Sequence, residues 1–529
     1  MNNFRHFSLL EKSHSLSTRK ILLAILSGVM LTASFPPGKL SFLVWFAFVP
    51  LFISIGNESH FQAFKLGLIS GIAHYFTLVY WIMIVLGHYG DLNLFYSFGT
   101  FVLLSLYLAL YPAFFCGLAS LIADTRFHIL LMPGFWVGLE YIRSKLLTGF
   151  PWCLLGYTQY RHLNLIQIAD LFGVYGISFF IILINVLIYH LFFKNRHETK
   201  ISLKFEIFIV ALITGGILGY GQYRLFETHS KKQSHQIIKV AAIQGNIDQS
   251  IKWDSAYQNR TMEIYQRLTR KIYDFKPDLI VWPETSVPFF FQNNSKFSPE
   301  VLSVTKESGA ALVFGSPAYR YIGEIKRYYN RAYLITPDND PPRFYDKVHL
   351  VPFGEYVPLK KFLFFINRLV PAAGDFDSGK KIVTLNYRDL RIGVLICFEA
   401  IFPEISRAQT KAGADLLVNL TNDAWFGLTN APYQHLSMAV LRAVENRRPM
   451  IRAANTGFSA FVSPEGEIYA LSTLFNEEAL KASVDISGSH STFYTRFGDL
   501  FALFLLVISI IKIISSCFAR RVASTRRPI

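Results

Sequence analysis

Long stretches of uncharged, mostly apolar residues recur along the first 225 residues of the chain, and one more lies near its C-terminus. Most approach the length of about 20 residues that an α-helix needs to cross the hydrocarbon core of a bilayer. Their approximate bounds are 21–36, 40–56, 62–87, 93–123, 127–145, 165–193, 204–223 and 498–515. This pattern predicts an α-helical polytopic membrane domain of about eight transmembrane helices, seven of them before residue 225.

Lysine and arginine residues gather on one side of these predicted spans. If the N-terminus lies inside, the cytoplasmic segments hold Arg5, Lys12, Arg19, Lys20, Lys65, Arg126, Lys194, Arg196, Lys200, Lys204, Arg520, Arg521, Arg526 and Arg527. The loops of the opposite side hold only Lys39, Arg143, Lys145 and Arg161. The positive-inside rule therefore predicts that both termini are cytoplasmic and that the long segment 224–495 lies on the outer face.

The formal charge of +16 raises the question of a nucleic-acid partner. Residues 237–487 contain 29 Lys+Arg and 26 Asp+Glu, a net charge of only +3. The remaining +13, from 23 basic and 10 acidic residues, lies in the apolar segments and their flanks. Because the positive charge is placed where membrane topology is specified, we expect no nucleic-acid partner.

The segment 224–495 has a different pattern. Short apolar runs rich in β-branched residues alternate with helical patterns such as the one at 255–275. The runs are 240–244, 278–284, 311–316, 331–337, 390–399 and 415–423. Continuous apolar strands that alternate with helices indicate an α/β domain whose strands are covered on both faces.

Three polar residues stand at or near the ends of predicted strands in this domain. Glu284 closes the run DLIVWPE, Lys347 lies in FYDKVHLVPFGEYVP, and Cys397 ends LRIGVLIC. Each alone has an ordinary explanation, such as a solvated surface charge or a small buried thiol. The four cysteines of the chain lie far apart and lack histidine partners at zinc spacing, so we expect no metal site.

Together, these three residue types can carry out acyl transfer. Cys397 follows a strand and precedes a predicted helix start at Pro403, where a helix dipole would favour the nucleophilic thiolate. A carboxylate can accept and return a proton, and an ammonium can stabilise the oxyanion of a tetrahedral intermediate.

Several motifs resemble those of known proteins. WPE at 282–284, YDKVHLVPFGEYVP at 345–358 and ICFE at 396–399 resemble the Glu-Lys-Cys signature of the carbon–nitrogen hydrolase (nitrilase) superfamily. Together with the apolar segments on both sides, the chain resembles the apolipoprotein N-acyltransferase family nearly end to end. Further motifs that carry this resemblance are TGFPW at 148–152, GVYGISF at 173–179, NIDQSIKW at 246–253, NLTNDAWFG at 419–427 and RAANTGFSAFV at 452–462.

The resemblance implies a nitrilase-like α-β-β-α sandwich at 236–487, between a membrane domain at 1–225 and a C-terminal helix with a basic tail at 496–529. By position in the motifs, it implies roles for eight residues: Glu284 as base, Lys347 as oxyanion lysine, Cys397 as nucleophile, Glu355, Glu399 and Phe398 as supporting residues, and Trp253 and Trp425 as substrate contacts. Phe398 stands where relatives often carry tyrosine, so only its backbone N–H is expected to contribute.

The resemblance also implies a reaction. An acyl chain passes from a phospholipid, the sn-1 chain of phosphatidylethanolamine, through a thioester on Cys397 to the N-terminal amine of diacylglyceryl-cysteine in an apolipoprotein. No cofactor is expected. The predicted location is the bacterial inner membrane, where a multi-pass monomer holds its catalytic domain in the periplasm.

Two other classes of function remain open from the residues themselves. A membrane-tethered nitrilase-type amidase that hydrolyses a soluble amide would share the three catalytic residues. A transporter with an accessory domain would instead use Asp170 and Glu140, which lie within apolar segments. Internal repeats would favour the transporter, and the sequence has none that we can identify.

Two apolar segments that follow the catalytic residues carry one more hypothesis. VPFFFQ at 287–292 and LKKFLFFINRLV at 359–370 are more apolar than ordinary exposed loops. We expect them to lie at the bilayer surface as a mobile lid, and the alternative is that they pack into the core of the domain.

Overall fold

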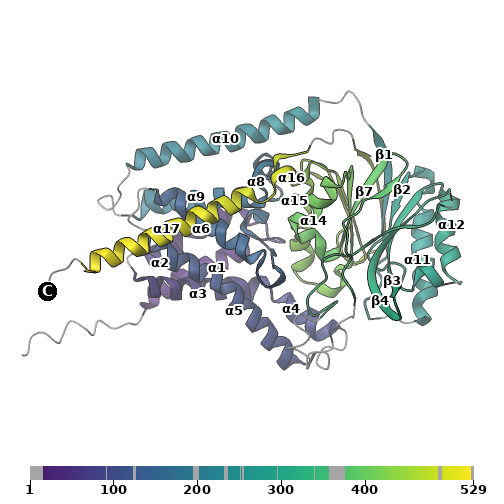
Figure 1. Ribbon diagram of the computed structural model, residues 1–529, viewed down its shortest axis with the longest axis horizontal. Helices are drawn as coiled ribbons and strands as arrows, with labels where there is room; N and C mark the ends of the chain where they lie inside the picture. Colours follow the sequence, from purple (N-terminus) through teal and green to yellow (C-terminus); the bar gives the residue numbers. More distant parts are fainter. Residues whose placement is uncertain are drawn as a thin grey trace, which may run out of the picture.

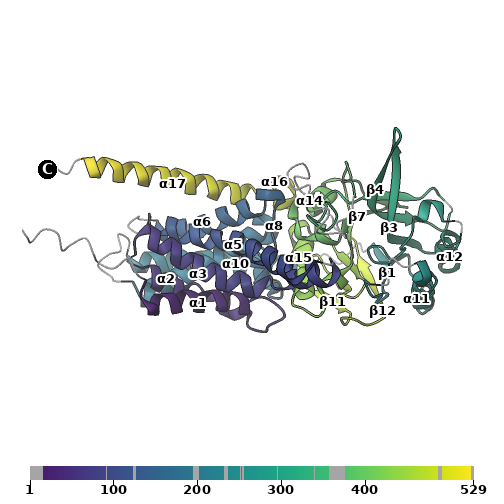
Figure 2. The same cartoon turned by 90° about the horizontal axis from the view of Figure 1, so that it is seen from below.

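The computed structural model describes residues 16–525, except 57, 91, 123–126, 195–201, 231–235, 251, 253–254, 295, 339, 357–375 and 487–490. A bundle of helices occupies one end of the molecule and an α/β sandwich the other, as two views at right angles show (Figures 1 and 2). The C-terminal helix, drawn in yellow, returns from the sandwich along the bundle.

Every predicted apolar segment contains helix. The bounds are α1 Thr18–Ala33, η1 Ser41–Trp45, α2 Val49–Ile55, α3 His60–Leu78, α4 Trp81–Ile84, η2 Val85–Tyr89, α5 Leu94–Ala119, α6 His128–Arg143, η3 Leu146–Thr148, η4 Leu155–Gln159, α7 Leu163–Ile166, α8 Ala169–Phe172, α9 Val174–Phe192, α10 Leu203–Ser230, α16 Phe493–Phe497 and α17 Leu500–Thr525. Side chains cap three of these helices, since Ser59 accepts from Gln62 N before α3, Asn93 from Tyr96 N before α5, and Thr492 from Thr495 N before α16.

The count of eight spans is not confirmed. Among the described residues, four helices are long and apolar enough to cross a membrane: Leu94–Ala119, Val174–Phe192, Leu203–Glu227 and Leu500–Phe518. A fifth results if His60–Leu78 and Trp81–Tyr89, bent by 47°, form one span. α1 and α6 have 16 residues each, about 24 Å at 1.5 Å per residue, and are shorter than the hydrocarbon core.

Glycines bring α1, α3 and α5 into close contact. A Cβ added at Gly28 of α1 would lie 2.3 Å from the Ser70 carbonyl oxygen of α3. A Cβ at Gly67 of α3 would lie 2.5 Å from the Pro112 carbonyl oxygen of α5. Small residues at such crossings allow helix backbones to approach, as is common in membrane helix packing.

The α/β part contains two six-stranded sheets, with strand orders β12-β1-β2-β3-β4-β5 and β11-β10-β9-β8-β7-β6. The strands are β1 Ile237–Gln244, β2 Leu279–Val281, β3 Ala311–Ile322, β4 Ile325–Ile335, β5 Arg343–Asp346, β6 Leu385–Tyr387, β7 Leu390–Ile396, β8 Leu416–Thr421, β9 Met450–Ala454, β10 Ala460–Val462, β11 Ile468–Leu471 and β12 Glu478–Asp485. The central strands β1-β2-β3 and β7-β8-β9 are parallel.

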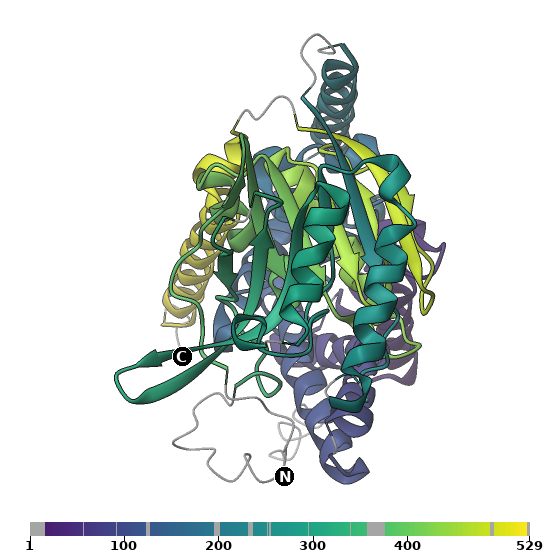
Figure 3. The ribbon, with the colours of Figure 1, turned by 90° about the vertical axis from the view of Figure 1, so that its right-hand side faces the viewer.

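Helices cover both outer faces of the paired sheets. α11 Gln258–Arg270 and α12 Ser298–Ser308 lie on the first sheet, and α14 Pro403–Lys411 and α15 Ala431–Asn446 on the second (Figures 1 and 3). In β1, Val240 and Ala242 pack between the sheets, whereas Ala241 and Ile243 pack toward the helices. This alternation of faces explains the continuous apolar run, and the predicted α-β-β-α sandwich is confirmed.

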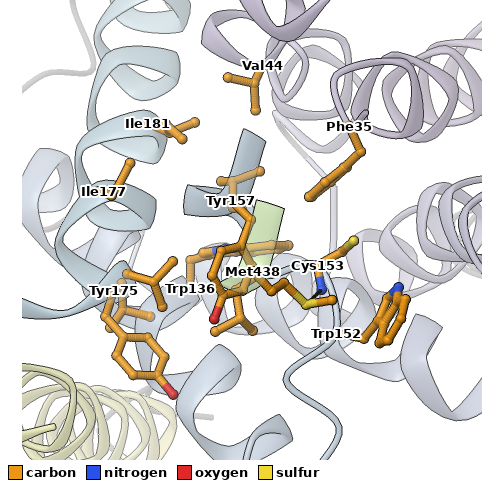
Figure 4. Close-up of a cluster of buried hydrophobic side chains, with 14 of the residues drawn as sticks. Phe35, Val44, Trp136, Trp152, Cys153, Tyr157, Tyr175, Ile177, Ile181 and Met438 are labelled. Carbon is orange, nitrogen blue, oxygen red and sulfur yellow. Dashed lines mark hydrogen bonds between the residues drawn. The ribbon is translucent and has the colours of Figure 1, made fainter. Parts of the chain in front are cut away.

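The second sheet and its helices share one apolar core with the bundle. Leu395, Leu417 and Val440 belong to the same buried cluster as the membrane helices. Figure 4 shows Met438 of α15 among bundle residues that include Cys153, whose backbone N–H contacts the Met438 sulfur at 3.4 Å. The sandwich therefore packs against the helical bundle through α15.

Polar contacts reinforce this interface between the sandwich and the bundle. Trp152 Nε1 donates to Gln434 Oε1 at 2.7 Å, and Arg442 donates to the Tyr157 hydroxyl at 2.9 Å. Asp170 of α8 accepts from Arg447 at 2.8 Å. We call Asp170 and the residues that contact it, Arg447, Tyr220 and Arg224, the Asp170 cluster.

The two acidic residues of the transporter hypothesis have structural partners. Asp170 Oδ1 accepts from the Tyr220 hydroxyl at 2.8 Å, and its Oδ2 pairs with Arg224 at 3.0 Å. Glu140 Oε1 accepts from the backbone N–H of Leu155 at 2.7 Å. Asp170 thus forms ion pairs that join α8 to α10 and to the sandwich, and Glu140 holds the backbone at the start of η4.

Candidate active site

The three residues predicted to act together follow the ends of three strands of the sandwich. Glu284 lies three residues beyond β2, Lys347 directly follows β5, and Cys397 directly follows β7. Lys347 Nζ lies 3.5 Å from Glu284 Oε1. Both charged groups are close enough to Cys397 to shift the pKa of its thiol. The structure thus joins a carboxylate, an ammonium and a thiol in one buried site.

Glu284 is held by tight packing of the turn after β2. Trp282 is fully buried, stacks on Tyr265 with ring centroids 5.0 Å apart, and donates to Thr269 at 3.0 Å. A Cβ at Gly315 of β3 would lie 2.7 Å from the Glu284 Cα, so only glycine allows this approach. The rigid turn fixes the direction of the carboxylate.

Lys347 lies between two carboxylates and is 1% exposed. Its Nζ pairs with Glu355 Oε2 at 2.9 Å, in addition to Glu284. Burial alone would lower the pKa of Lys347, but the two carboxylates outweigh it and raise the pKa above its ordinary value. The ammonium is therefore permanently charged and can stabilise a developing oxyanion.

Asn330 and Glu355 hold this ion cluster in place. The Asn330 amide donates to Glu284 Oε1 and to Glu355 Oε1, each at 2.8 Å. Glu355 Oε2 also accepts from the Val351 backbone N–H at 2.8 Å. Glu355, a predicted supporting residue, thus orients Lys347. Asn330 had no distinguishing signal in the sequence.

Cys397 occupies an unusual backbone conformation, with φ of +51°. This left-handed region costs a non-glycine residue on the order of 1 kcal/mol or more and is concentrated at functional sites. Burial raises the pKa of the Cys397 thiol to about 12, and Glu284 adds to the rise, whereas Lys347 opposes it. The resting site therefore holds a thiol.

This state of Cys397 differs from the expectation of a thiolate favoured by a helix dipole. Residues Cys397–Ile401 form only a short 3-10 helix, η9, and α14 begins at Pro403 as predicted. The dipole of one short turn is too small to offset burial of the sulfur. A base must consequently remove the thiol proton during attack.

Glu399 joins the nucleophile turn to the lysine loop. Its Oε2 accepts from Ile396 N at 2.7 Å, and its Oε1 accepts from Val348 N at 2.7 Å and from the Tyr345 hydroxyl at 2.9 Å. Burial raises the pKa of Glu399 to about 7, although the surrounding N–H donors favour the carboxylate. Its place is that of a positioning residue.

Lys252 is a buried cation that sequence analysis missed. It is 1% exposed, and its Nζ donates to the Glu284 carbonyl oxygen at 3.1 Å. Burial lowers the pKa of Lys252 to about 8, against the opposing effect of Glu284 and Cys397. Lys252 belongs to the motif NIDQSIKW, in which the family resemblance implies a role only for the neighbouring Trp253, and Trp253 lies outside the described residues.

A second missed group lies behind the nucleophile. His435 of α15 has Nε2 3.3 Å from the Cys397 carbonyl oxygen and Nδ1 3.0 Å from Asp423 Oδ1. Arg452 pairs with Asp423 Oδ2 at 2.7 Å, and all three of these side chains are fully buried. Burial and the charge of Arg452 lower the pKa of His435. This buried triad supports the backbone of Cys397.

The aromatic residues predicted near the site line the side that faces the helices. Trp425, in η10 Asp423–Phe426, is half-buried, and its ring lies 5.9 Å from Tyr89. The next residue, Phe426, contacts Trp81 with centroids 5.0 Å apart. Phe398 is half-buried beside Phe402, at 5.2 Å. These rings form an apolar wall between the nucleophile turn and the bundle.

The lid hypothesis is wrong for residues 287–292. Val287, Phe289 and Phe291 are at most 6% exposed and belong to the core between the first sheet and α11 and α12. Their apolar character serves packing, because Phe291 contacts both Phe314 and Tyr333. The second segment, 359–370, lies outside the described residues.

Comparison with known families supports the sequence resemblance over both parts of the chain. The model of the apolipoprotein N-acyltransferase N-terminal domain matches residues 27–187, and the carbon-nitrogen hydrolase model matches residues 239–493. Among solved structures, Saccharomyces cerevisiae Nit3, a member of the nitrilase superfamily, is 21% identical, with a TM-score of 0.37 over 47% of this chain and 90% of its own.

Curated relatives match almost the whole chain. The apolipoprotein N-acyltransferase of Geobacter metallireducens is 46% identical over 488 residues, which cover 92% of each chain. That of Methylococcus capsulatus is 32% identical over 513 residues, or 95% of this chain and 96% of the relative. On this agreement of sequence from end to end, the chain belongs to the apolipoprotein N-acyltransferase family.

Proposed function

We propose that this chain transfers an acyl chain from a phospholipid, the sn-1 chain of phosphatidylethanolamine, to the N-terminal amine of diacylglyceryl-cysteine in an apolipoprotein. Membership of the family supports this reaction, because the relatives carry the name apolipoprotein N-acyltransferase. The observation that carries the proposal is the buried Glu284–Lys347 pair beside Cys397. Its aromatic wall faces the membrane helices, so a lipid ester can approach from that side.

In the first half-reaction, the Cys397 sulfur attacks the ester carbonyl carbon while its proton passes to Glu284. Lys347 and the backbone N–H of Phe398 stabilise the oxyanion of the tetrahedral intermediate. When the intermediate collapses, the ester C–O bond breaks and Glu284 returns the proton to the leaving alkoxide. The products are a thioester on Cys397 and a lysophospholipid.

In the second half-reaction, the α-amine of diacylglyceryl-cysteine attacks the thioester carbonyl. Glu284 accepts a proton from the amine, the C–S bond breaks, and the sulfur regains a proton as the amide forms. The site must exclude water during the lifetime of the thioester, and a lipid-lined approach achieves this. No step needs an external source of energy, because a thioester is more reactive than an amide.

The proposed setting follows the sequence predictions. The enzyme would be a multi-pass monomer of the bacterial inner membrane, with eight spans, cytoplasmic termini and a periplasmic catalytic domain at 236–487. The apolar helices and the family support membrane association. The distribution of lysine and arginine supports the orientation.

A transfer assay tests the proposal against the amidase alternative. Purified protein is mixed with phosphatidylethanolamine carrying a labelled sn-1 chain and with a diacylglyceryl-cysteine peptide. We expect the label in the peptide's N-terminal amide, with one lysophospholipid per amide formed. The same peptide with an acetylated N-terminus should support no turnover. Steady release of labelled free fatty acid, independent of the peptide amine, would contradict transfer and favour hydrolysis.

Two cysteine variants give the assay its controls. Cys397→Ser should form no amide, because a serine hydroxyl lacks comparable nucleophilicity at this site. Cys517→Ala should retain normal turnover, because Cys517 is exposed in the C-terminal half of α17, and this helix runs away from the sandwich (Figure 1). Loss of activity in Cys517→Ala with normal activity in Cys397→Ser would overturn the assignment of the nucleophile.

A further inference from the structure

Polar side chains join helix α10 to the bundle near its two ends, and a groove lies along the stretch between these ends. Near one end, Glu206 Oε2 pairs with His190 Nδ1 of α9 at 2.8 Å, and both side chains are buried. Near the other end, Tyr220 and Arg224 contact Asp170. Only 11% of the apolar span of α10 is buried inside the protein. In Figure 1, α10 runs along the edge of the bundle, on the same side as α9.

A groove with a volume of about 730 Å³ occupies this region. Its size falls within the range of about 300–1,000 Å³ that is typical of small-molecule sites. The wall consists of Trp45 of η1, Phe180 and Ile184 of α9, and Thr214 and Leu218 of α10. Most of these side chains are apolar and come from helices that we treat as membrane spans, so a chain of hydrocarbon fits them.

The end of the groove beside η4 and α7 is polar and cationic. Gln159, Arg161, His162 and Asn164 form this rim, and none of the described residues that line the groove is acidic. The Arg161 Nε donates to the Tyr160 hydroxyl at 2.8 Å, which leaves the terminal nitrogens of the guanidinium for another partner. Among the described residues, no carboxylate lies within ion-pair distance of Arg161. A guanidinium in this setting is suited to a phosphate.

We propose that this groove binds one glycerophospholipid, with its phosphate at Arg161 and His162 and one acyl chain between α9 and α10. The arrangement of a cationic rim above an apolar wall matches the two chemical ends of that molecule. The described residues that line the groove all belong to the helical part. The site is therefore distinct from the one that contains Cys397.

The flank of α10 beside the groove is open to the bilayer. A Cβ added at Gly215, Gly216 or Gly219 would meet no atom within 4 Å. A lipid can reach the groove sideways through such an opening, and its chain supplies the contacts that α10 lacks.

Photo-crosslinking of the full-length protein tests this site. The probe is a phosphatidylglycerol with a diazirine in one acyl chain, incorporated into phosphatidylcholine proteoliposomes. We expect crosslinked peptides from α9 and α10 that include Phe180, Ile184 or Leu218. Arg161→Gln should reduce this labelling about tenfold, the factor expected from loss of one charge-assisted hydrogen bond. Millimolar inorganic phosphate should not compete, because the acyl chain contributes to binding.

Two substitutions on α10 separate the groove from general lipid contact. Leu218→Trp fills the groove and should abolish the labelling. Leu212→Trp, at a position 65% exposed on the same helix, is the matched control and should leave it intact. Equal labelling of all exposed faces of α10, unchanged by Leu218→Trp and Arg161→Gln, would overturn the proposal. Leu218→Trp and Arg161→Gln should both keep Cys397 acylation. Failure of this site is therefore distinguishable from failure of the proposed reaction.

Discussion

The Cys397 thiol and its charged neighbours determine how the reaction can begin. Burial raises the pKa of the thiol to about 12, so almost no thiolate exists at neutral pH. The proton must therefore move to Glu284 as the sulfur attacks, and Lys347 must compensate the negative charge that forms. Lys347 is already held between Glu284 and Glu355, so little reorganisation is needed at that moment.

Lys252 should give the acylation step a pH dependence. Burial lowers the pKa of Lys252 to about 8, so its ammonium is present below pH 8 and is lost as the pH rises above it. This loss removes a positive charge near Glu284 and Cys397. We expect single-turnover acylation to slow as the pH passes through about 8. Lys252→Met should be slow throughout and lack this inflection, whereas the exposed Lys271→Met should behave like the unaltered protein. A rate that keeps rising to pH 10 in both forms would contradict the assignment.

His435 should act by positioning the nucleophile. Its Nε2 lies 3.3 Å from the Cys397 carbonyl oxygen, so His435→Ala would release the left-handed turn at Cys397. We expect kcat to fall on the order of 100-fold, the effect of misplacing a reacting group, with KM nearly unchanged. His435→Gln should recover part of the rate. An unchanged kcat, or a rise in KM alone, would show that His435 does not position Cys397.

Two kinds of signal mark the site residues found from the sequence. Glu284 and Cys397 end predicted apolar strands, where a polar group stands out. Lys347 lies in the motif YDKVHLVPFGEYVP, which carries the family resemblance. His435 and Lys252 lie in a buried helix and a turn, where no periodicity marks them. Their partners come from distant segments, so only the folded chain brings them to the site.

At the scale of elements, α15 links the catalytic site to the bundle. All but one of its residues are buried, because the helix lies between the second sheet and the membrane helices. A helix enclosed on all sides has no solvent-facing polar stripe, which is why the sequence pattern did not reveal it. Gln434 and His435, adjacent in sequence, contact Trp152 and Cys397 respectively.

Burial and length also determined which strands could be predicted from the sequence. Six predicted strands correspond to β1, β2, β3, β4, β7 and β8, whose residues are mostly buried. Their predicted bounds are 240–244, 278–284, 311–316, 331–337, 390–399 and 415–423. β5, β6 and β11 have three or four residues each, too few to form a pattern. β12 alternates exposed and half-buried residues at a sheet edge, and its charges concealed it.

The Asp170 cluster should contribute substantially to stability. Asp170→Asn would leave the buried Arg447 and the half-buried Arg224 without their shared carboxylate. Breaking a buried pair typically costs about 3–5 kcal/mol, so we expect a clear fall in Tm in detergent. Glu263→Gln breaks an exposed i,i+3 pair with Arg260 and is the matched control, with little change expected. Equal Tm values for the two variants would contradict the role of the cluster.

At the scale of the whole molecule, the helical bundle shares a buried apolar core with the second sheet and its helices. The sandwich could be predicted from strand patterns and the family motifs, and its two sheets agree with that prediction. The number of membrane spans in the helical part was harder to predict from the sequence, because an apolar segment can form either a buried helix or a membrane span. The segment at 40–56, for example, divides into η1 and α2, and α1 and α6 are shorter than a typical span. The boundaries 1–225, 236–487 and 496–529 stay predictions.

Reporter fusions test the predicted topology. A reporter that is active only outside the cytoplasm should be active when fused after Lys232. The same reporter fused after Arg527 should be inactive, because an odd number of spans precedes the sandwich and one follows it. A cytoplasmic reporter at the same two positions should give the reverse pattern. Activity of one reporter at both positions would contradict the span count.

The central claim is that Cys397 carries the acyl chain between donor and acceptor. The most direct measurement is intact-protein and peptide mass spectrometry after the purified enzyme is mixed with phosphatidylethanolamine labelled in its sn-1 chain, without any acceptor. The account predicts one labelled acyl group per protein, bound to Cys397 and released by hydroxylamine, and none in Cys397→Ala. Labelled amide formed at a normal rate by Cys397→Ala, or label at another residue of the unaltered protein, would contradict it.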